Sequence, residues 1–115
     1  MIKKIYRLNE NEVKKVLKYK KPFFSYSIVA NVNPNRLWHS RFAIVLGSKT
    51  CKTAVSRNFF RRKYFDLVSG FINKWSSDIV CVIKKWKILD KKDENAILDF
   101  ERDLKFLLKN IFNNK

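Results

Sequence analysis

Cationic side chains concentrate in one segment of the chain, residues 48–63. Arg57 and Arg61 are four residues apart, so on a helix they share a face and repel each other unless an anion bridges them. Arginine can hold a phosphate through two hydrogen bonds, and the free amides of a helix N-terminus also suit a phosphate. A solvated basic helix face would give the same pattern, so both interpretations stay open. The side chains predicted to bind phosphates of a nucleic acid are Lys49, Lys52, Arg57, Asn58, Arg61 and Arg62.

A second set of side chains combines aromatic rings with the nearby basic residues Lys20 and Lys21. Single-stranded nucleic acids bind to aromatic rings that line a positively charged groove. Phe23, Phe24 and Tyr26 could supply such rings, although alternation along a strand would bury about half of them. We predict that Phe24 and Tyr26, which share a strand face, are the exposed pair.

No group of side chains in the sequence forms a recognisable catalytic or metal site. His39 is the single histidine, belongs to no serine-histidine-acid arrangement in the nearby sequence, and is expected to be an exposed loop residue. No spacing of histidine, cysteine and carboxylate resembles a metal site. The sequence therefore predicts no catalytic residue, no metal ligand and no independent nuclease site.

The charge balance indicates a polyanionic partner. The chain has 115 residues, with 26 Lys and Arg against 10 Asp and Glu, for a formal net charge of +16. A compact chain with that imbalance repels itself, and a polyanion relieves the repulsion. An anionic membrane surface would attract the same charge, so charge alone does not decide between RNA and lipid.

The length and the cysteine usage indicate a single domain over residues 1–115, expected in the cytoplasm, and the charge and the aromatic residues together favour nucleic acid as its partner. Cys51 and Cys81 form no Cys-x-x-Cys pair, which fits a reducing compartment without disulfides. No run approaches the ~20 apolar residues that span a bilayer, so we expect neither a membrane span nor a signal peptide.

Hydrophobic periodicity predicts six elements in the order αββαβα, an α+β two-layer sandwich with a small sheet covered by helices. Asn9 and Glu12 have capping-box spacing before the first helix, and Thr53 is a plausible N-cap for the second. The two strands nearest the N-terminus are expected to pair antiparallel. The apolar run of the third strand indicates burial on both faces. The predicted elements are a helix over 10–19, strands over 23–32 and 41–47, a helix over 54–72, a strand over 79–83 and a helix over 93–112.

The segment 48–63 resembles the signature of the bacterial ribonuclease P protein, approximately Ser-Lys-Lys-x-Gly-Asn-Ala-Val-x-Arg-Asn-Arg-x-Lys-Arg. Arg61 replaces a lysine of the signature with the same charge. The resemblance continues at Arg7-Leu8, at Asp78-Ile79-Val80 and at Lys84-Lys85. The residues that match the signature directly are Ser48, Lys49, Ala54, Val55, Arg57, Asn58 and Arg62.

Three places depart from the family pattern. Phe59 stands where the Arg-Asn-Arg core ends in Arg, and Phe65 occupies a position that is often Arg. Lys52-Thr53 replaces the usual Gly-Asn. The chain therefore resembles a divergent member in which some RNA contacts on this helix are altered.

The resemblance implies a protein subunit that is not itself the catalyst. In the family, a large RNA with bound Mg²⁺ cuts the 5′ leader from precursor tRNA, and the protein assists. The resemblance implies two partners, the catalytic RNA and precursor tRNA, with no membrane, no small-molecule substrate and no cofactor bound by the protein alone.

The family's geometry supplies further expectations. The signature helix and its preceding loop would contact the catalytic RNA, and a cleft between the first helix and the sheet would hold the single-stranded leader. The family fold, like domain 2 of ribosomal protein S5, contains a left-handed βαβ crossover, whereas ~98% of crossovers are right-handed. With the first helix included, the predicted leader-binding residues are Val13, Leu17, Lys20, Phe24 and Tyr26.

Three alternatives stay open at this point. One is another RNA-binding module of the ribosomal type, which only the signature helix distinguishes. A second is a basic peripheral membrane protein, whose binding to anionic vesicles would survive excess tRNA. A third is a free-standing nuclease, which the dispersed carboxylates argue against.

Overall fold

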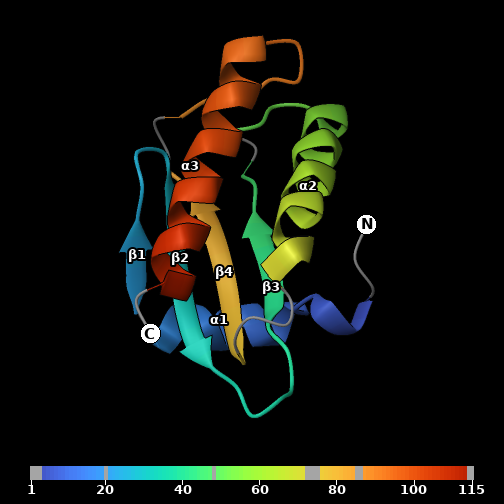
Figure 1. Ribbon diagram of the computed structural model, residues 1–115. Helices are drawn as coiled ribbons and strands as arrows, with labels where there is room; N and C mark the ends of the chain where they lie inside the picture. The colour runs from blue at the N-terminus through green and yellow to red at the C-terminus, as the bar shows by residue number, and fades with distance from the viewer. Residues whose placement is uncertain (1–3, 20, 48, 72–75, 85–86, 114–115) are drawn as a thin grey trace.

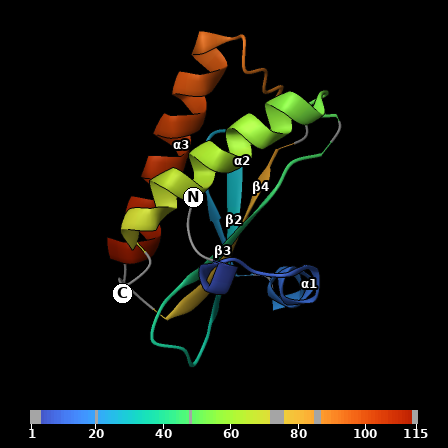
Figure 2. The ribbon, with the colours of Figure 1, turned by 90° about the vertical axis from the view of Figure 1, so that its right-hand side faces the viewer.

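The computed structural model describes residues 4–19, 21–47, 49–71, 76–84 and 87–113. One mixed sheet with the strand order β1-β2-β4-β3 forms the centre of the fold. Figures 1 and 2 show that α2 and α3 cover one face of the sheet, whereas α1 crosses the other. The mixed α+β prediction is confirmed. The elements are η1 (Lys4–Tyr6), α1 (Glu10–Tyr19), β1 (Pro22–Phe24), β2 (Ile28–Pro34), β3 (Arg41–Val45), α2 (Ala54–Val68), η2 (Ser69–Phe71), β4 (Ser77–Ile83) and α3 (Glu94–Asn113).

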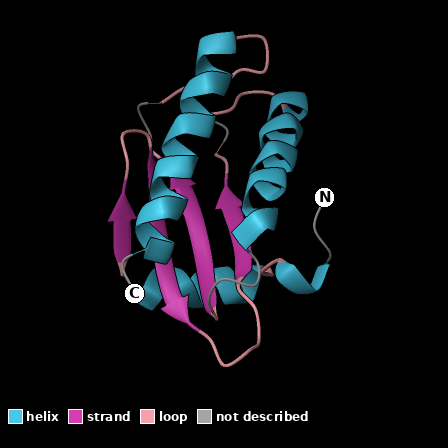
Figure 3. Cartoon of the chain, viewed as in Figure 1, coloured by secondary structure: helices cyan, strands magenta, loops and turns pink. Residues whose placement is uncertain are grey.

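The strand β4 lies inside the sheet, between β2 and β3 (Figure 3). It pairs antiparallel with β2 and parallel with β3, and every residue of β4 except Val82 is buried. Burial on both faces was predicted from its apolar run. The predicted antiparallel pairing of the strands 23–32 and 41–47 is wrong, because β4 lies between them. A strand that is apolar on both faces gains most from a central position.

The single strand predicted over 23–32 is a hairpin of two strands, β1 and β2, which pair antiparallel. Ser25 makes the turn between them. Its backbone N–H and its hydroxyl both donate to the carbonyl oxygen of Ile28, at 2.9 and 3.0 Å. Serine side chains that bond nearby backbone groups favour turns over strands, and this interrupts the expected strand.

The connection from β3 through α2 to β4 is left-handed, as the family resemblance implied. In Figure 1 both strands point upward, and the chain passes from β3 on the right, through α2 nearer the viewer, to β4 on its left. Physical preference alone favours the opposite hand. The first turns of α2 lie at the end of the sheet where β3 and β4 finish.

The main core lies between the sheet and the two helices α2 and α3. On the predicted inner face of α2, Phe60, Tyr64 and Val68 are buried, and Leu67 and Phe71 are half-buried against the same core. Because this face is occupied by apolar contacts, the cationic side chains of α2 are left on its outer surface.

Both cysteines are buried and free. Burial raises the pKa of the Cys81 thiol to about 12, and burial also raises the pKa of Cys51. Neutral thiols without a disulfide partner behave as small apolar residues, so the prediction that Cys81 is an ordinary core residue is confirmed.

A network of ion pairs holds α1 against the sheet. The guanidinium of Arg41 in β3 donates to both carboxylate oxygens of Asp78 in β4, at 2.9 and 2.8 Å. The same guanidinium is paired with Glu12 of α1. Asn35 donates to Asp78 at 2.8 Å. The hydrogen bonds with Asp78 are the main cause that raises the pKa of Arg41. Because Arg41 pairs with both Asp78 and Glu12, it links β3 and β4 to α1.

The predicted helix caps are confirmed. The Asn9 amide donates to the Glu12 carboxylate at 2.8 Å, and the Glu12 amide donates to the Asn9 side chain at 2.9 Å, which completes the capping box. At the start of α2, the Ser56 amide donates to the Thr53 hydroxyl at 3.1 Å.

Replacing Thr53 with Ala is expected to lower the free energy of unfolding by about 1 kcal/mol, because the first turn of α2 loses its side-chain acceptor. Urea denaturation followed by circular dichroism measures the loss. Thr53→Ser keeps the hydroxyl and should stay close to the original protein. Equal stability of the Ala and original proteins would show that the cap contributes nothing.

Candidate nucleic-acid interface

The predicted phosphate-binding residues of α2 form a polar ridge on its outer side. Asn58, Arg61 and Arg62 are exposed, and Arg61 donates to the side-chain oxygen of Asn58 at 3.0 Å. Arg57 is half-buried, and one of its guanidinium nitrogens donates to the carbonyl oxygen of Cys51 at 3.0 Å. Arg57 therefore ties the first turn of α2 to the loop before it, in addition to carrying charge.

The loop before α2 presents the two predicted lysines to solvent. Lys49 and Lys52 are both exposed. The loop folds back on Gly47, whose carbonyl oxygen accepts from the amides of Thr50 and Cys51 at 3.2 and 2.9 Å. This compact turn places both lysines next to the N-terminus of α2, where the helix dipole adds further positive potential.

Not every cation of the segment belongs to this surface. Lys63 forms an ion pair with Glu101 of α3 at 2.6 Å and lies over the ring of Phe59. Phe59 itself is half-buried against the core and packs edge-on against Phe60, with ring centroids 5.2 Å apart. Where the family signature has an arginine, this chain therefore has a ring that adds packing. Phe65, the other departure, is buried.

Two lysines that the sequence did not single out lie beside the same helix terminus. The amide of Leu89 donates to the Thr50 carbonyl oxygen at 2.7 Å, and the amide of Lys91 donates to the Ser56 hydroxyl at 3.3 Å. These bonds hold Lys91 and Lys92 next to the start of α2, where both line a shallow hollow of about 330 Å³. No local motif connects positions so far apart, so only the fold identifies them.

The sheet face that α1 crosses carries one row of apolar side chains that spans all four strands. The row is set by the strand register, which pairs Phe24 with Val29, Val29 with Val82, and Val82 with Val45. Phe24 is 61% exposed and Val45 is also exposed, so the row is open at both ends. The predicted exposure of Phe24 is confirmed.

The helix α1 forms a wall beside this row. Val16 is buried against Val80 and Ala43, in the next row of the same face. Val13 and Leu17 are half-buried at the edge of that cluster, which also includes Val82. The two residues predicted from the family's leader cleft therefore lie partly in the packing of α1 and partly at its surface.

Tyr26 is exposed, as predicted, but it lies in the turn between β1 and β2. Strand alternation therefore does not determine whether its ring shares a face with Phe24. Lys20 lies outside the described residues.

The two predicted surfaces meet in an open hollow of about 360 Å³. Val13 of α1 and Arg61 of α2 both line it, together with Lys4 and Arg7 of the N-terminal segment. Three cations and one carboxylate, that of Glu10, thus line a hollow whose apolar floor includes Ala43 and Ile44. This combination suits an RNA backbone with an adjacent base.

Within the described part of the chain, no group of three or more His, Cys, Asp and Glu residues could hold a metal ion. His39 is half-buried rather than exposed, because its ring packs edge-on against Tyr6 with centroids 4.7 Å apart. No helix among the described residues is long and apolar enough to cross a membrane.

Fold and surface together define a small basic α+β domain. The profile of the Ribonuclease P family matches residues 2–111, so the chain belongs to the ribonuclease P protein family. No curated protein sequence matches the chain.

Solved structures of the same family share the fold. The Staphylococcus aureus RNase P protein has a TM-score of 0.69 and 22% identity, and the match covers 90% of this chain and 93% of that one. A mutant of that protein with defective mRNA degradation activity has a TM-score of 0.71 and 23% identity, and the match covers 92% of this chain and 87% of the mutant. The Thermotoga maritima RNase P protein has a TM-score of 0.64 and 23% identity, and the match covers 95% of this chain and 96% of that one.

Proposed function

We propose that this chain is the protein subunit that helps ribonuclease P remove the 5′ leader from precursor tRNA. Family membership supports the ribonuclease P assignment. The observation that carries the finer proposal is the hollow at which the cationic helix and the α1 side of the sheet meet, since Arg61 and Val13 both line it. One RNA assembly could therefore contact both surfaces at once.

The cationic surface around the start of α2 would bind the catalytic RNA. Its exposed lysines and arginines can each neutralise a phosphate, and the helix N-terminus adds positive potential. Arg57 is held by its bond to the Cys51 carbonyl oxygen, which reduces the conformational entropy that the side chain loses on binding. The contacts proposed for the catalytic RNA are Lys49, Lys52, Arg57, Asn58, Arg61, Arg62, Lys91 and Lys92.

The apolar row on the sheet would hold the single-stranded leader beside α1. A base can stack on the exposed ring of Phe24 and continue over Val29 and Val82, which are its neighbours in the row. Val13 and Leu17 would form the wall, and Tyr26 would contribute at the edge. Lys20, which lies outside the described residues, is the remaining side chain predicted to contact the leader. Stacking of this kind tolerates many sequences, as leaders of different tRNAs require.

Replacing Phe24 with Ala is expected to weaken binding of a leader-bearing precursor tRNA by ~1–3 kcal/mol, the contribution of one stacked base. Mature tRNA, which has no leader, should bind both proteins equally. Fluorescence anisotropy with the two labelled RNAs measures the difference. Phe23 packs against the main core on the other face of the sheet, so a Phe23 variant is not a suitable control. Phe24→Tyr, which keeps an aromatic ring, is the matched control. Equal losses for both RNAs would contradict a leader contact.

The catalytic chemistry in this proposal belongs to the RNA. Mg²⁺ would be held by the catalytic RNA, and the protein would supply phosphate contacts and a leader platform in the cytoplasm, where tRNA transcripts are processed. The protein alone should therefore leave precursor tRNA intact, whereas protein plus ribonuclease P RNA should release the leader faster than the RNA alone. Cleavage by the protein alone, or no stimulation, would contradict the proposal.

A further inference from the structure

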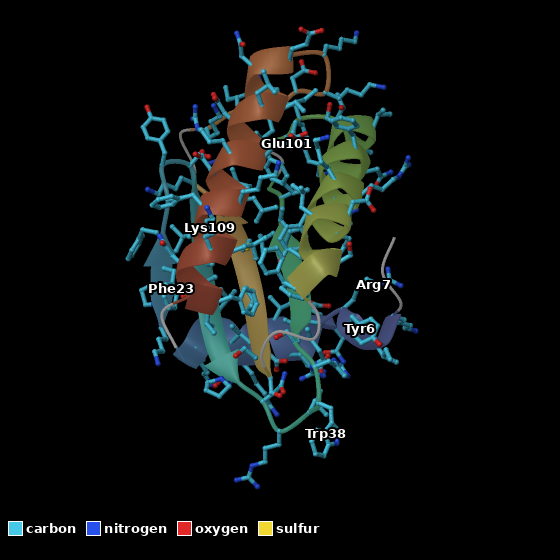
Figure 4. All side chains as sticks on the ribbon, in the orientation of Figure 1. Tyr6, Arg7, Phe23, Trp38, Glu101 and Lys109 are labelled. Atoms are coloured by element: carbon cyan, nitrogen blue, oxygen red, sulfur yellow. The ribbon has the colours of Figure 1, made fainter. Side chains whose placement is uncertain are left out.

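Trp38 is displayed at one end of the molecule with 96% of its surface exposed. Figure 4 shows its ring pointing away from the body of the protein, at the tip of the loop between β2 and β3. Leu37 and Arg36 beside it are also exposed. Tryptophan is highly buried on average, because removing so large an apolar ring from water stabilises the folded protein. Trp38 does not make that contribution to stability here.

The base of this loop is firmly held. The Asn35 amide donates to the Ser76 carbonyl oxygen at 2.9 Å, and the Asn35 side chain donates to Asp78 at 2.8 Å. The Leu37 amide donates to the Asn35 side chain at 2.9 Å. On the far side, the Ser77 amide donates to the Ser40 hydroxyl at 3.3 Å. The loop that bears Trp38 is therefore held in place, which lowers the conformational entropy lost when the ring makes a contact.

The loop also adjoins the cationic hollow. His39 packs against Tyr6, and Tyr6 precedes Arg7, which lines the hollow with Lys4. Figure 4 shows Tyr6, Arg7 and Trp38 at the same side of the molecule. Arg36, two residues before Trp38 in the chain, is an exposed cation of the same loop. An RNA strand that leaves the hollow along this side meets Trp38 without crossing α1.

We propose that Trp38 stacks on an unpaired RNA base and that Arg36 contacts the adjacent phosphate. This inference rests on the proposed function. It adds an RNA contact that is separate from the apolar row, because α1 lies between that row and the loop of Trp38. The charge of the chain favours RNA as the occupant, because the net charge is +16. A stable protein interface buries about 800 Å² of surface per partner, and the side chains of Leu37 and Trp38 together provide far less.

The test compares the original protein with Trp38→Leu, Trp38→Tyr and Arg36→Ala. Binding of ribonuclease P RNA and of precursor tRNA is measured by anisotropy of the labelled RNAs. Trp38→Leu should weaken binding of one of the two RNAs about 5- to 150-fold, the range expected for one stacked base. Trp38→Tyr should retain most of the affinity, and Arg36→Ala should reduce the salt slope by about one. Because these side chains are exposed, the variants should fold normally.

Two results would overturn the inference. The first is that Trp38→Leu binds both RNAs with an affinity within about twofold of the original protein. The second is that the Leu and Tyr variants lose the same amount of RNA affinity. Either result excludes stacking. Phosphatidylglycerol vesicles that shift the emission of the original protein but not of Trp38→Leu, with RNA binding unchanged, would assign the ring to a membrane instead. Leader cleavage by the original protein is run in parallel: its absence contradicts the proposed function, while the RNA affinities still decide the role of Trp38.

Discussion

Replacing Asp78 with Ala should lower the free energy of unfolding by roughly 3 kcal/mol. Asp78 and Arg41 form a two-pronged ion pair whose side chains are only 10% and 20% exposed. The substitution leaves the guanidinium of Arg41 with the Glu12 carboxylate alone, and it removes an acceptor of Asn35. A cation that loses its main partner in a largely buried position costs several kcal/mol, which is a large share of a domain's stability.

Urea denaturation measures the effect, with Glu10→Ala as the matched control. Glu10 is also a carboxylate, but its ion pair with Lys14 is exposed at 3.7 Å, so its loss should stay below about 1 kcal/mol. Because the network also positions α1, Asp78→Ala should weaken leader binding even under conditions in which the variant is folded. A loss for Asp78→Ala no larger than that for Glu10→Ala would show that the network does not hold the fold.

Replacing Arg57 with Ala should weaken binding of ribonuclease P RNA by ~1–3 kcal/mol, the value of a charge-assisted hydrogen bond. The double variant with Arg61→Ala should lose more, and its salt slope should fall by about two, one for each lost phosphate contact. Arg57→Lys keeps the charge but not the two-pronged geometry, so it should recover only part of the affinity. Filter binding over a range of salt concentrations measures both quantities.

Lys63→Ala provides the control for this prediction. It removes the same charge from the same helix, but Lys63 is already paired with Glu101, so the affinity should stay within about twofold of the original. Arg57 also bonds the Cys51 carbonyl oxygen, and the stability of Arg57→Ala must therefore be measured alongside its affinity. Equal losses of RNA affinity for Lys63→Ala and Arg57→Ala would show that α2 contributes only non-specific positive charge.

The helices and the central strand were predictable because their signals are local. Capping by Asn9 and Thr53 and the spacing of Phe60 and Tyr64 depend on residues within a few positions of each other. Strand pairing depends on competition between distant segments, and the sequence could not show that β4 would separate β2 from β3. The handedness of the crossover came from resemblance alone, since general physical preference favours the other hand.

The same distinction applies to the candidate interface. The cations of α2 and the exposure of Phe24 follow from helical spacing and strand character. Lys91 and Lys92 join that surface only because the loop before α3 bonds to Thr50 and Ser56. The neutralisation of Lys63 likewise depends on a carboxylate from another helix, Glu101. Neither effect has a signal in the local sequence.

The most direct test of the central claim is 5′-leader cleavage of a precursor tRNA by ribonuclease P RNA at low Mg²⁺, with and without this protein. Our account predicts strong stimulation by the original protein, little stimulation by the Arg57→Ala, Arg61→Ala double variant, and normal stimulation by Lys63→Ala. No stimulation by the original protein, with its RNA binding intact, would contradict the account and would indicate an RNA-binding protein with a different task.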